Sequence, residues 1–244
     1  MPRFFVTKEQ ISDNIILING SDAHHIARSL RMVEGDEAVV CDGCGGEYLC
    51  KLLRIRDEEC QCEIIEKIES RTEPAIFITL CMAYPKGDKL EMVIQKAVEL
   101  GAARIIPFES SRCIKRPKAE KAEKQNARLS RIAEEAAKQC GRTIIPEVTP
   151  PMTYKQMLTE ATKSDMALFC YEAEDGMSIK EAFAKNETPS SISIIVGSEG
   201  GFSNDEAEEA KVAGCISVSL GNRILRCETA PAYALSAISY RYEL

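Results

Sequence analysis

Apolar residues from position 75 onward follow two alternating patterns. Short apolar runs bounded by turn residues are typical of buried strands. They are AIFITLCMA (75–83), ARIIPF (103–108), TIIPEV (143–148), MALFC (166–170), SISIIV (191–196) and CISVSL (215–220). Segments of helical period lie between them. Strands separated by helices in this way predict an α/β fold with a parallel sheet that is covered on both faces.

The clearest of the helical segments is residues 88–101. Its apolar positions recur at the spacing of one helical face. They are Leu90, Val93, Ile94, Ala97 and Val98. Because Asp88 can cap the start of this helix and Gly101 can end it, the segment predicts a helix with one buried face.

Residues 1–71 show a different pattern of short β-type runs, several of them separated by glycine turns. The runs are FFV (4–6), NIILI (14–18), EAVVCDG (37–43), EYLCKLLRI (47–55) and CQCEIIEKI (60–68). One helix is predicted at 22–31. Short strands at this spacing favour a small barrel. We therefore expect a barrel domain at 1–71, a linker at 72–74 and an α/β domain at 75–244.

The composition is that of an ordinary globular protein, with 244 residues of which 45% are hydrophobic and 28% charged. No run of about 18 apolar residues occurs and the N-terminus has no signal-like pattern, so we expect a cytoplasmic protein without membrane spans. Eleven cysteines are scattered without a disulfide framework, and most are expected to be small buried hydrophobes. CDGC (41–44) and CQC (60–62) lack the spacing of two zinc knuckles, so no metal is predicted.

The distribution of charge is more informative than its net value of −7. Residues 112–142 include ten Lys or Arg against four Asp or Glu. This excess fits either a solvated helix face or an electrostatic footprint for a phosphate backbone. ESSRCIKRPK (109–118) is typical of a phosphate-contacting loop. In AYPKGDKLE (83–91), Lys86 and Lys89 either face an anionic substrate or decorate an exposed turn.

Two further loops follow predicted strands that end at the same edge of the sheet. GSEGGFSNDEAEEA (197–210) begins as a glycine-rich loop and leads into a helix that starts near Ser203 or Asn204. Glycines let a backbone approach a ligand closely, although this is neither a dinucleotide fingerprint nor a P-loop. LGNRILRCETA (220–230) follows the next strand. Open α/β sheets bind ligands at this edge, so we expect a ligand site here.

The arginines of the second loop allow two interpretations. A buried Arg223 or Arg226 needs an anionic partner, because an unpaired buried charge is strongly destabilising. Glu228 supplies one such partner, so a purely structural ion pair is the alternative to a ligand-binding role. With only His24 and His25 in the chain, the α/β part holds no Ser-His-Asp triad.

Five motifs occur in an order that resembles the RsmE family of 16S rRNA (uracil-N3)-methyltransferases. They are YPKGDKLE…QKAVELG, SSRCIKR, EEAAKQCGRTIIPEV, VGSEGGFS and LGNRILRCETA. PRFFV and HHIARSLRMVEGDEAVVCDG are similar to the family's N-terminal domain, so the resemblance covers essentially the whole chain. Asn222 and Ser198 stand where the family usually has proline, and Cys227 where it usually has threonine.

The resemblance implies a PUA-like RNA-binding β-barrel at 1–71 and a SPOUT methyltransferase domain at 75–244, whose parallel sheet carries a C-terminal trefoil knot. It also implies S-adenosyl-L-methionine as the cofactor, a homodimer, and 16S rRNA or the small ribosomal subunit as the partner. The cofactor would be bound by loop residues, namely Cys170, Tyr171, Glu172, Val196, Gly197, Glu199, Gly200, Gly201, Leu220, Gly221, Arg223, Ile224, Leu225, Arg226, Thr229 and Ala230.

The implied reaction methylates N3 of one uridine, which must be unpaired or flipped to reach the donor. A cation near O2 or O4 would stabilise the uracil anion, and Arg226 is the candidate. Glu228 is a second catalytic candidate, with Glu199 or water as alternatives for the base. RNA phosphates would contact basic residues of both domains, namely Arg3, Arg28, Arg31, Lys86, Arg112, Lys115, Arg116 and Arg142.

Other functions stay open at this point. They are a non-catalytic RNA-binding or ribosome-assembly protein, a knotted methyltransferase acting on another RNA site, and a nucleotide-binding or nucleotide-hydrolysing domain. The GSEGG and RILRCETA motifs weigh against a non-catalytic protein. The N-terminal domain weighs against most knotted methyltransferases that act on other RNA sites. The missing P-loop lysine weighs against a nucleotide-binding or nucleotide-hydrolysing domain. The last helix has a face that is either dimer interface or core, formed by Ala232, Leu235, Ile238 and Ser239.

Overall fold

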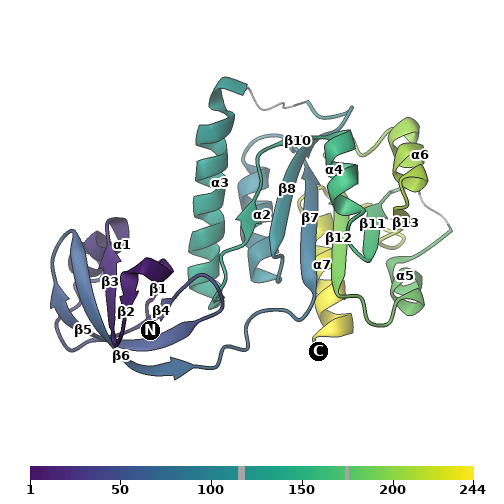
Figure 1. The fold of residues 1–244 in the computed structure, drawn as a ribbon. Helices are drawn as coiled ribbons and strands as arrows, with labels where there is room; N and C mark the ends of the chain where they lie inside the picture. Colours follow the sequence, from purple (N-terminus) through teal and green to yellow (C-terminus); the bar gives the residue numbers. More distant parts are fainter. Residues whose placement is uncertain (115–118, 174–175) are drawn as a thin grey trace. The chain divides into compact units, whose positions relative to one another are not determined.

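The fold is described by a computed structural model for residues 1–114, 119–173 and 176–244 (Figure 1). The chain forms two compact units, one of residues 1–73 and 137–145 and the other of residues 74–136 and 146–244. The first unit therefore includes residues 137–145 from the middle of the chain. The ranges expected from the sequence place these residues in the α/β domain at 75–244.

The first unit contains a six-stranded sheet in the order β1-β4-β5-β6-β3-β2. Strands β1 and β4 pair in parallel, and the other neighbours pair antiparallel. Its elements are β1 (Arg3–Phe5), η1 (Lys8–Gln10), β2 (Ile11–Ser12), β3 (Ile15–Asn19), α1 (Ser21–His24), η2 (His25–Ser29), β4 (Glu37–Cys41), β5 (Glu47–Ile55) and β6 (Glu59–Ile68).

The core of this unit is built from residues that alternate along the strands, because successive side chains of a strand point to opposite faces. Ile16 and Ile18 of β3 are buried at this period, and so are Cys60 and Cys62 of β6. All eleven cysteines are free and nine are buried, which confirms their prediction as small hydrophobes. Burial raises the pKa of the Cys62 thiol to about 12, so it stays protonated.

The helix predicted at 22–31 is shorter and irregular. It begins as α1 and continues as the π-helical turn η2, which ends at Ser29. Arg31 has a φ of +52°, in the left-handed region that ends a helix. The prediction of one regular helix is therefore wrong in its last turn.

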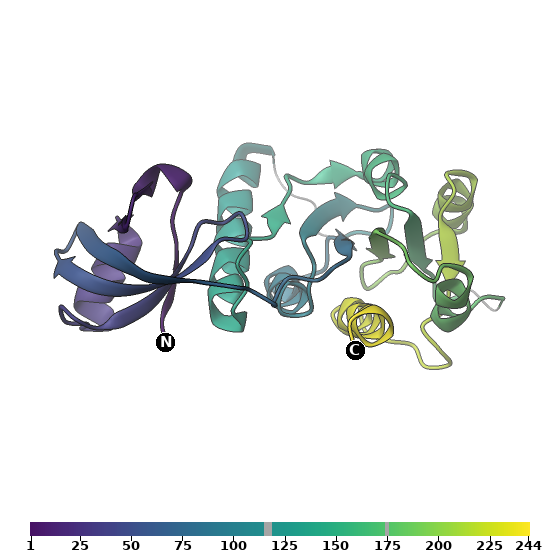
Figure 2. The same cartoon turned by 60° about the horizontal axis from the view of Figure 1, so that its bottom comes forward.

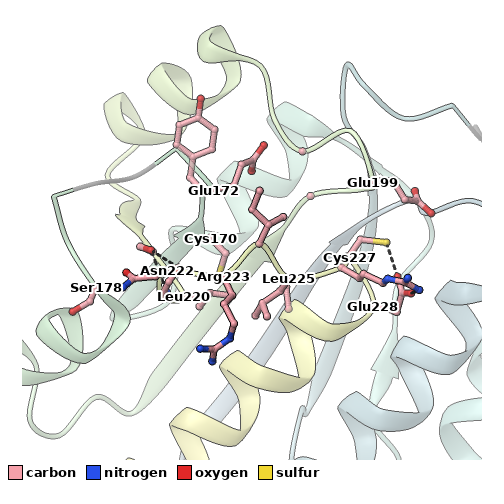
Figure 3. Close-up of a pocket in the computed structure, with 18 of the residues that line it drawn as sticks. Cys170, Glu172, Ser178, Glu199, Leu220, Asn222, Arg223, Leu225, Cys227 and Glu228 are labelled. Atoms are coloured by element: carbon pink, nitrogen blue, oxygen red, sulfur yellow. Dashed lines mark hydrogen bonds and ion pairs between the residues drawn. The ribbon is translucent and has the colours of Figure 1, made fainter.

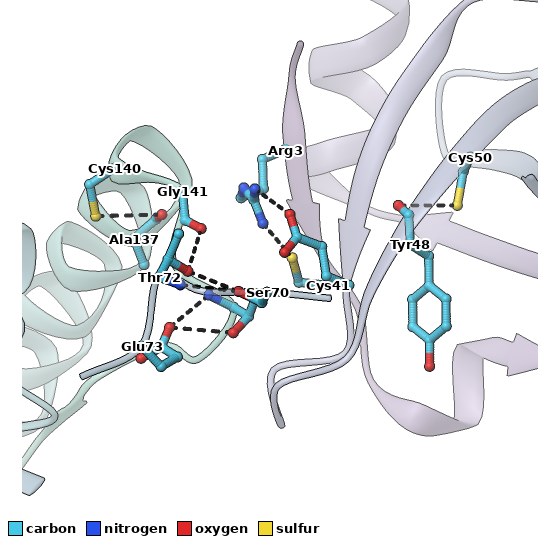
Figure 4. Close-up of polar contacts among 12 residues, drawn as sticks. Arg3, Cys41, Tyr48, Cys50, Ser70, Thr72, Glu73, Ala137, Cys140 and Gly141 are labelled. Carbon is cyan, nitrogen blue, oxygen red and sulfur yellow. Dashed lines mark hydrogen bonds and ion pairs between the residues drawn. The ribbon is translucent and has the colours of Figure 1, made fainter. Parts of the chain in front are cut away.

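Glu73 holds together the segments that form the edge of the first unit. The guanidinium of Arg142 donates to Glu73 Oε2 from Nη2 at 2.7 Å and from Nε at 3.1 Å. The backbone N–H groups of Thr143 and Ile144 donate to Glu73 Oε1 at 2.8 and 3.1 Å. Figure 4 shows this edge, where Thr72 Oγ1 also donates to the Gly141 carbonyl at 3.0 Å. The carboxylate is thus bound on both oxygens.

Replacing Glu73 by Gln is expected to lower the free energy of unfolding by about 1–3 kcal/mol, because the buried Arg142 guanidinium loses its ion pair with this carboxylate. Burial raises the pKa of Glu73, but Arg142 and the two backbone N–H groups lower it more, so the net pKa is below its ordinary 4.5. The stabilisation is therefore present above that value and is lost as the pH falls through the folded-state pKa. Urea unfolding of both proteins at pH 7 and pH 3 measures this difference.

The matched control for this prediction is Glu69→Gln, since Glu69 is an exposed carboxylate near the same linker. Its free energy of unfolding should equal that of the unchanged protein at both pH values. A Glu73→Gln protein as stable as the control at pH 7 would contradict the prediction.

The second unit contains a seven-stranded parallel sheet, as the sequence predicts. The order is β10-β8-β7-β12-β11-β13, with β9 paired to β8. Its elements are β7 (Phe77–Ala83), α2 (Lys89–Glu99), β8 (Arg104–Glu109), α3 (Ala119–Cys140, which ends in the first unit), β9 (Glu147–Val148), β10 (Met152–Thr153), α4 (Tyr154–Ala161), β11 (Met166–Cys170), α5 (Ile179–Lys185), β12 (Ser191–Val196), α6 (Asn204–Val212), β13 (Ile216–Val218) and α7 (Thr229–Tyr242).

Helices cover both faces of this sheet. Figure 2 shows α2 and the yellow α7 on one face and α4 on the opposite face. Helix α2 packs against α7, and α4 packs against β7, β8 and β12. The five apolar residues predicted to share one face of α2 are all buried, which confirms that prediction.

One local prediction in this region is corrected, and one open alternative is narrowed. TIIPEV forms a strand only at Glu147–Val148, because the N–H groups of Thr143 and Ile144 donate to Glu73 instead of to the sheet. In α7, Leu235 and Ile238 are fully buried in the core of the unit. Of the four residues left open as interface or core, Leu235 and Ile238 are therefore core, while Ala232 and Ser239 are half-buried.

Candidate active site

Three loops at the carboxyl ends of β11, β12 and β13 line one cavity of about 960 Å³. These loops are residues 170–178, 197–203 and 219–228. Figure 3 shows Glu172 and Cys170 of the first loop, Glu199 of the second and Arg223 and Leu225 of the third around the same space. Parallel strands bring their carboxyl ends to one edge, which explains how segments distant in sequence meet there.

The 197–203 loop is short and closely packed. It turns at Ser198, whose carbonyl accepts from the N–H of Gly201 at 2.9 Å. Gly201 has a φ of +62°, and a Cβ atom there would lie 2.1 Å from Glu172 Oε1. Only glycine fits this conformation and this close approach without strain. Ser203 then caps α6, with Glu206 completing a capping box, so the predicted helix start is confirmed.

The 219–228 loop exposes most of its side chains to the cavity. Ile224 is 91% exposed, and Leu225 is half-buried. The carbonyl of Arg226 accepts from the N–H groups of Thr229 and Ala230 at 2.8 and 2.9 Å, which begins helix α7. The loop therefore presents two apolar side chains at the cavity and then turns abruptly into a helix.

The 170–178 loop is fixed at both of its described ends. Tyr171 donates its backbone N–H to Val218 and its hydroxyl to Asn204 Oδ1 at 3.1 Å. Ser178 caps α5 and forms a bridge to Ser219. These contacts join the first loop to the start of α6 and to the 219–228 loop.

A lysine and two carboxylates meet at one end of the cavity. Lys89 Nζ lies 3.0 Å from Glu199 Oε1 and 3.1 Å from Glu228 Oε2. The Cys227 thiol donates to Glu228 Oε2 at 3.2 Å (Figure 3). The pKa of Glu228 lies below its ordinary value. The hydrogen bond from the backbone N–H of Glu228 lowers this pKa most, and the contacts with Cys227 and Lys89 lower it further. Burial raises the pKa of Cys227 to about 12, so the thiol is neutral.

The two arginines of the 219–228 loop are not buried. Arg226 Nη1 lies 4.0 Å from Glu228 Oε1, and its side chain is 85% exposed. Arg223 is also exposed and lines the cavity. The structural ion pair between Arg226 and Glu228 is thus marginal, and Lys89 is the closer partner of Glu228.

Most residues predicted to bind a cofactor line this cavity. Those that do are Cys170, Tyr171, Glu172, Gly197, Glu199, Gly201, Leu220, Gly221, Arg223, Ile224, Leu225, Arg226 and Ala230, together with the catalytic candidate Glu228. Val196, Gly200 and Thr229 lie next to lining residues without lining the cavity themselves.

Sequence reasoning missed several lining residues, namely Gly176, Met177, Ser178, Glu181, Ser198, Ser219, Asn222 and Cys227. Gly176, Met177 and Ser178 come from the end of the loop between β11 and α5, and Glu181 comes from α5 itself. The proximity of α5 to β13 brings this loop to the cavity. The sequence carries no signal for that proximity.

Two models of known protein families match this chain. The model of an RNA methyltransferase domain matches residues 72–239, and that of an RNA methyltransferase PUA domain matches residues 18–65. The ribosomal RNA small subunit methyltransferase E of Bacillus subtilis (strain 168) is 38% identical over 251 residues, covering 100% of this chain and 98% of that relative. The chain belongs to the ribosomal RNA small subunit methyltransferase E family. The family predicted from the motifs is confirmed, with its PUA-like N-terminal domain.

Two solved structures resemble the chain over nearly its whole length. The ribosomal RNA small subunit methyltransferase E of Neisseria gonorrhoeae, bound to S-adenosyl methionine, has a TM-score of 0.88 at 28% identity and covers 98% of this chain and 97% of that one. A methyltransferase of Legionella pneumophila in complex with the cofactor SAM has a TM-score of 0.88 at 30% identity, with coverage of 98% and 96%.

Among the basic residues assigned to RNA in this methyltransferase, two are engaged inside the protein. Arg142 is 3% exposed and bound by Glu73, so its prediction as a phosphate contact is wrong. Arg3 donates to Glu47 Oε1 at 2.6 Å and to Cys41 Sγ at 2.9 Å (Figure 4), which leaves little of its guanidinium exposed. Residues whose functional groups satisfy internal partners are poor phosphate ligands.

The other basic residues of the set lie on the surface or outside the described ranges. Arg28 is exposed beside Asp57, and Arg31, Lys86 and Arg112 are exposed as well. Arg112 Nη1 donates to the carbonyl of Gly200 at 3.0 Å, which connects it to the 197–203 loop. Lys115 and Arg116 lie outside the described residues.

Two structural features bear on metals and membranes. Within the described ranges, no group of three or more His, Cys, Asp or Glu side chains is arranged to hold a metal ion. None of the described helices has both the length and the apolar character to cross a membrane.

Proposed function

We propose that this protein transfers a methyl group from S-adenosyl-L-methionine to N3 of a specific uridine in 16S rRNA. Membership of the family supports the reaction class, and the relatives solved with bound cofactor support the donor. The observation that carries the proposal is that the three predicted cofactor loops line one cavity. Its volume of about 960 Å³ lies in the usual range for pockets that enclose a small molecule.

The residues around the cavity fit this donor, which carries positive charges on its sulfonium and its amino group. Glu172, Glu181, Glu199 and Glu228 place four carboxylates among the lining residues. The apolar side chains of Ile224 and Leu225 suit an adenine face, and backbone groups near Leu220 and Gly221 suit its polar edge. When bound, the cofactor supplies an electrophilic methyl group.

We also assign a trefoil knot to the C-terminal part of this fold. The order of strands supports it, because β11 lies between β12 and β13. After β13 at the edge of the sheet, the chain returns to pack α7 against β12 and α2. The 219–228 loop must therefore cross the carboxyl ends of two strands that precede it in sequence.

In the proposed mechanism, the target uracil would be extruded from the RNA and its N3 would lose a proton as the N–C bond forms. The bond between sulfur and the methyl group would break at the same time and leave S-adenosyl-L-homocysteine. Arg226 is the catalytic candidate, since its exposed guanidinium at the cavity can stabilise negative charge on O2 or O4 of the base. Glu228 has a lowered pKa and is held by Lys89. Because Lys89 and the Cys227 thiol already engage this carboxylate, water is the proposed acceptor of the N3 proton.

The PUA-like unit and the exposed basic residues support RNA as the partner. Arg28 and Arg31 of the first unit and Lys86 and Arg112 of the second are the proposed phosphate contacts, with Lys115 and Arg116 added from the sequence. The site of action is the cytoplasm, which suits eleven free cysteines. A homodimer is proposed as the active unit, and exposed Tyr233 and Tyr240 of α7 offer it an aromatic contact surface.

The proposed function is tested by incubating the protein with labelled S-adenosyl-L-methionine and either free 16S rRNA or small subunits that lack the modification. Mass spectrometry of the digested nucleosides is expected to show 3-methyluridine. A different methylated nucleoside would support a knotted methyltransferase for another RNA site. Binding of rRNA without any binding of the donor in calorimetry would support a non-catalytic assembly protein instead.

A further inference from the structure

Lys89, the first residue of α2, joins two of the loops that line the cavity. Its ammonium pairs with Glu199 of the 197–203 loop and with Glu228 at the end of the 219–228 loop. The Glu199 carboxylate also accepts from the backbone N–H of Lys86, at 3.1 and 3.2 Å to its two oxygens. Segments that lie more than 100 residues apart in the sequence are thus connected through one side chain.

The donors of this ammonium are directed at the protein. A lysine has three N–H donors. Those of Lys89 have Glu199, Glu228 and, at 3.9 Å, the sulfur of Cys227 as partners. Since its partners are side chains of the two loops, Lys89 is suited to hold the loops in place at the wall of the cavity, which it also lines.

The contacts of Lys89 also affect how strongly Glu228 attracts the Arg226 side chain. Glu228 lies between two cations, with Lys89 at 3.1 Å and Arg226 at 4.0 Å. A carboxylate that is already neutralised by a close ammonium attracts a second cation less strongly. The Arg226 side chain is accordingly 85% exposed, although a carboxylate lies two residues away.

We propose that Lys89 is a positioning residue that connects the two loops and keeps Glu228 from pairing more closely with Arg226. This inference rests on the proposed function, because it assigns the exposed guanidinium of Arg226 to the target base. Loss of Lys89 frees the Glu228 carboxylate to turn toward Arg226 and neutralise it. The charge that stabilises the uracil anion is then reduced.

Both carboxylates are ionised at neutral pH, as this arrangement requires. Burial raises the pKa of Glu199, but hydrogen bonds from its own backbone N–H, from Lys89 and from Lys86 lower it below its ordinary value. The pKa of Glu228 is lowered as well. The contacts of Lys89 are therefore ion pairs and not neutral hydrogen bonds.

The first test compares turnover of Lys89→Met, Lys89→Arg and Lys96→Met. Lys96 is the matched control, because it lies on the same helix and pairs with Glu99 outside the cavity. Lys89→Met is expected to lower kcat roughly 10- to 100-fold with a smaller change in KM, and Lys89→Arg to restore most of it. Lys96→Met should behave as the unchanged protein.

A double variant separates this role from a merely structural one. Adding Glu228→Gln to Lys89→Met removes the carboxylate that would neutralise Arg226, so kcat is expected to recover roughly tenfold relative to Lys89→Met alone. If Lys89 had only a structural role, kcat would stay low or fall further when this second contact is removed. If kcat does not recover in the double variant, the proposal that Lys89 keeps Glu228 away from Arg226 is wrong.

Amide hydrogen exchange of the cofactor-free protein tests the tie between the loops without relying on methyl transfer. Lys89→Met is expected to speed exchange roughly tenfold in both 197–203 and 226–229, with no change in the Lys96→Met protein. Exchange that stays unchanged in both segments would refute the tie. A wild-type protein that shows this protection but transfers no methyl group would instead refute the proposed function alone.

Discussion

Arg226→Ala is expected to lower kcat by roughly 100- to 1000-fold while leaving the affinity for S-adenosyl-L-methionine within about twofold. The reason is that Arg226 presents a charged and 85% exposed side chain at the cavity, with one distant carboxylate partner at 4.0 Å. Such a cation stabilises charge that develops in the transition state without contributing much to ground-state binding. Single-turnover methylation and calorimetric titration of the donor measure the two quantities separately.

Arg241→Ala is the matched control, since Arg241 lies near the end of α7, outside the cavity, with its guanidinium over the ring of Tyr242. Its turnover should equal that of the unchanged protein. Arg226→Lys is expected to keep part of the activity, because a charge remains without the planar donor geometry. Unchanged turnover of Arg226→Ala would sink the catalytic assignment, and a parallel loss of donor affinity would make Arg226 a cofactor ligand.

The second large effect is expected for Gly201→Ala, which should weaken binding of the methyl donor roughly 10- to 100-fold. Gly201 has a φ of +62°, where alanine is strained by about 1–2 kcal/mol. Its new Cβ would also lie 2.1 Å from Glu172 Oε1, so the Glu172 side chain would have to turn away. Both residues line the cavity, so its wall changes shape.

Gly214→Ala separates these two causes. Gly214 also has a positive φ, of +99°, but a Cβ atom there meets nothing within 4 Å, and the residue does not line the cavity. This control carries the backbone strain without the close approach, so it should lose stability in thermal unfolding and bind the donor normally. Equal donor affinity in the two variants would contradict a role for the close approach of Gly201 and Glu172.

The sequence predicted the elements of the second unit well because its strands are buried on both faces. Such strands read as continuous apolar runs, and MALFC and SISIIV became β11 and β12 with the predicted bounds. Helix α2 was equally clear, since its period is set by one buried face. The Ser203 cap of α6 was also readable, because capping is a local interaction of a few adjacent residues.

Predictions that depended on partners far away in the sequence were less successful. Arg142 was assigned to RNA from its charge and its basic neighbours, but its partner Glu73 lies 69 residues earlier in the chain. The same carboxylate prevents TIIPEV from forming a full strand, because it binds two of the N–H groups that a sheet would need. A charge pattern alone does not distinguish a phosphate contact from an internal ion pair.

By itself, the sequence determined the family, the parallel α/β sheet, and the two loops that follow β12 and β13. These follow from local patterns and from motifs whose order along the chain is specific. The tertiary structure decided which charged groups meet: Lys89 reaches Glu199 and Glu228, and Arg226 is left exposed. Ion pairs form between side chains that the packing of α2 and of the sheet edge brings within about 4 Å, and that distance is not encoded in any one segment of the chain.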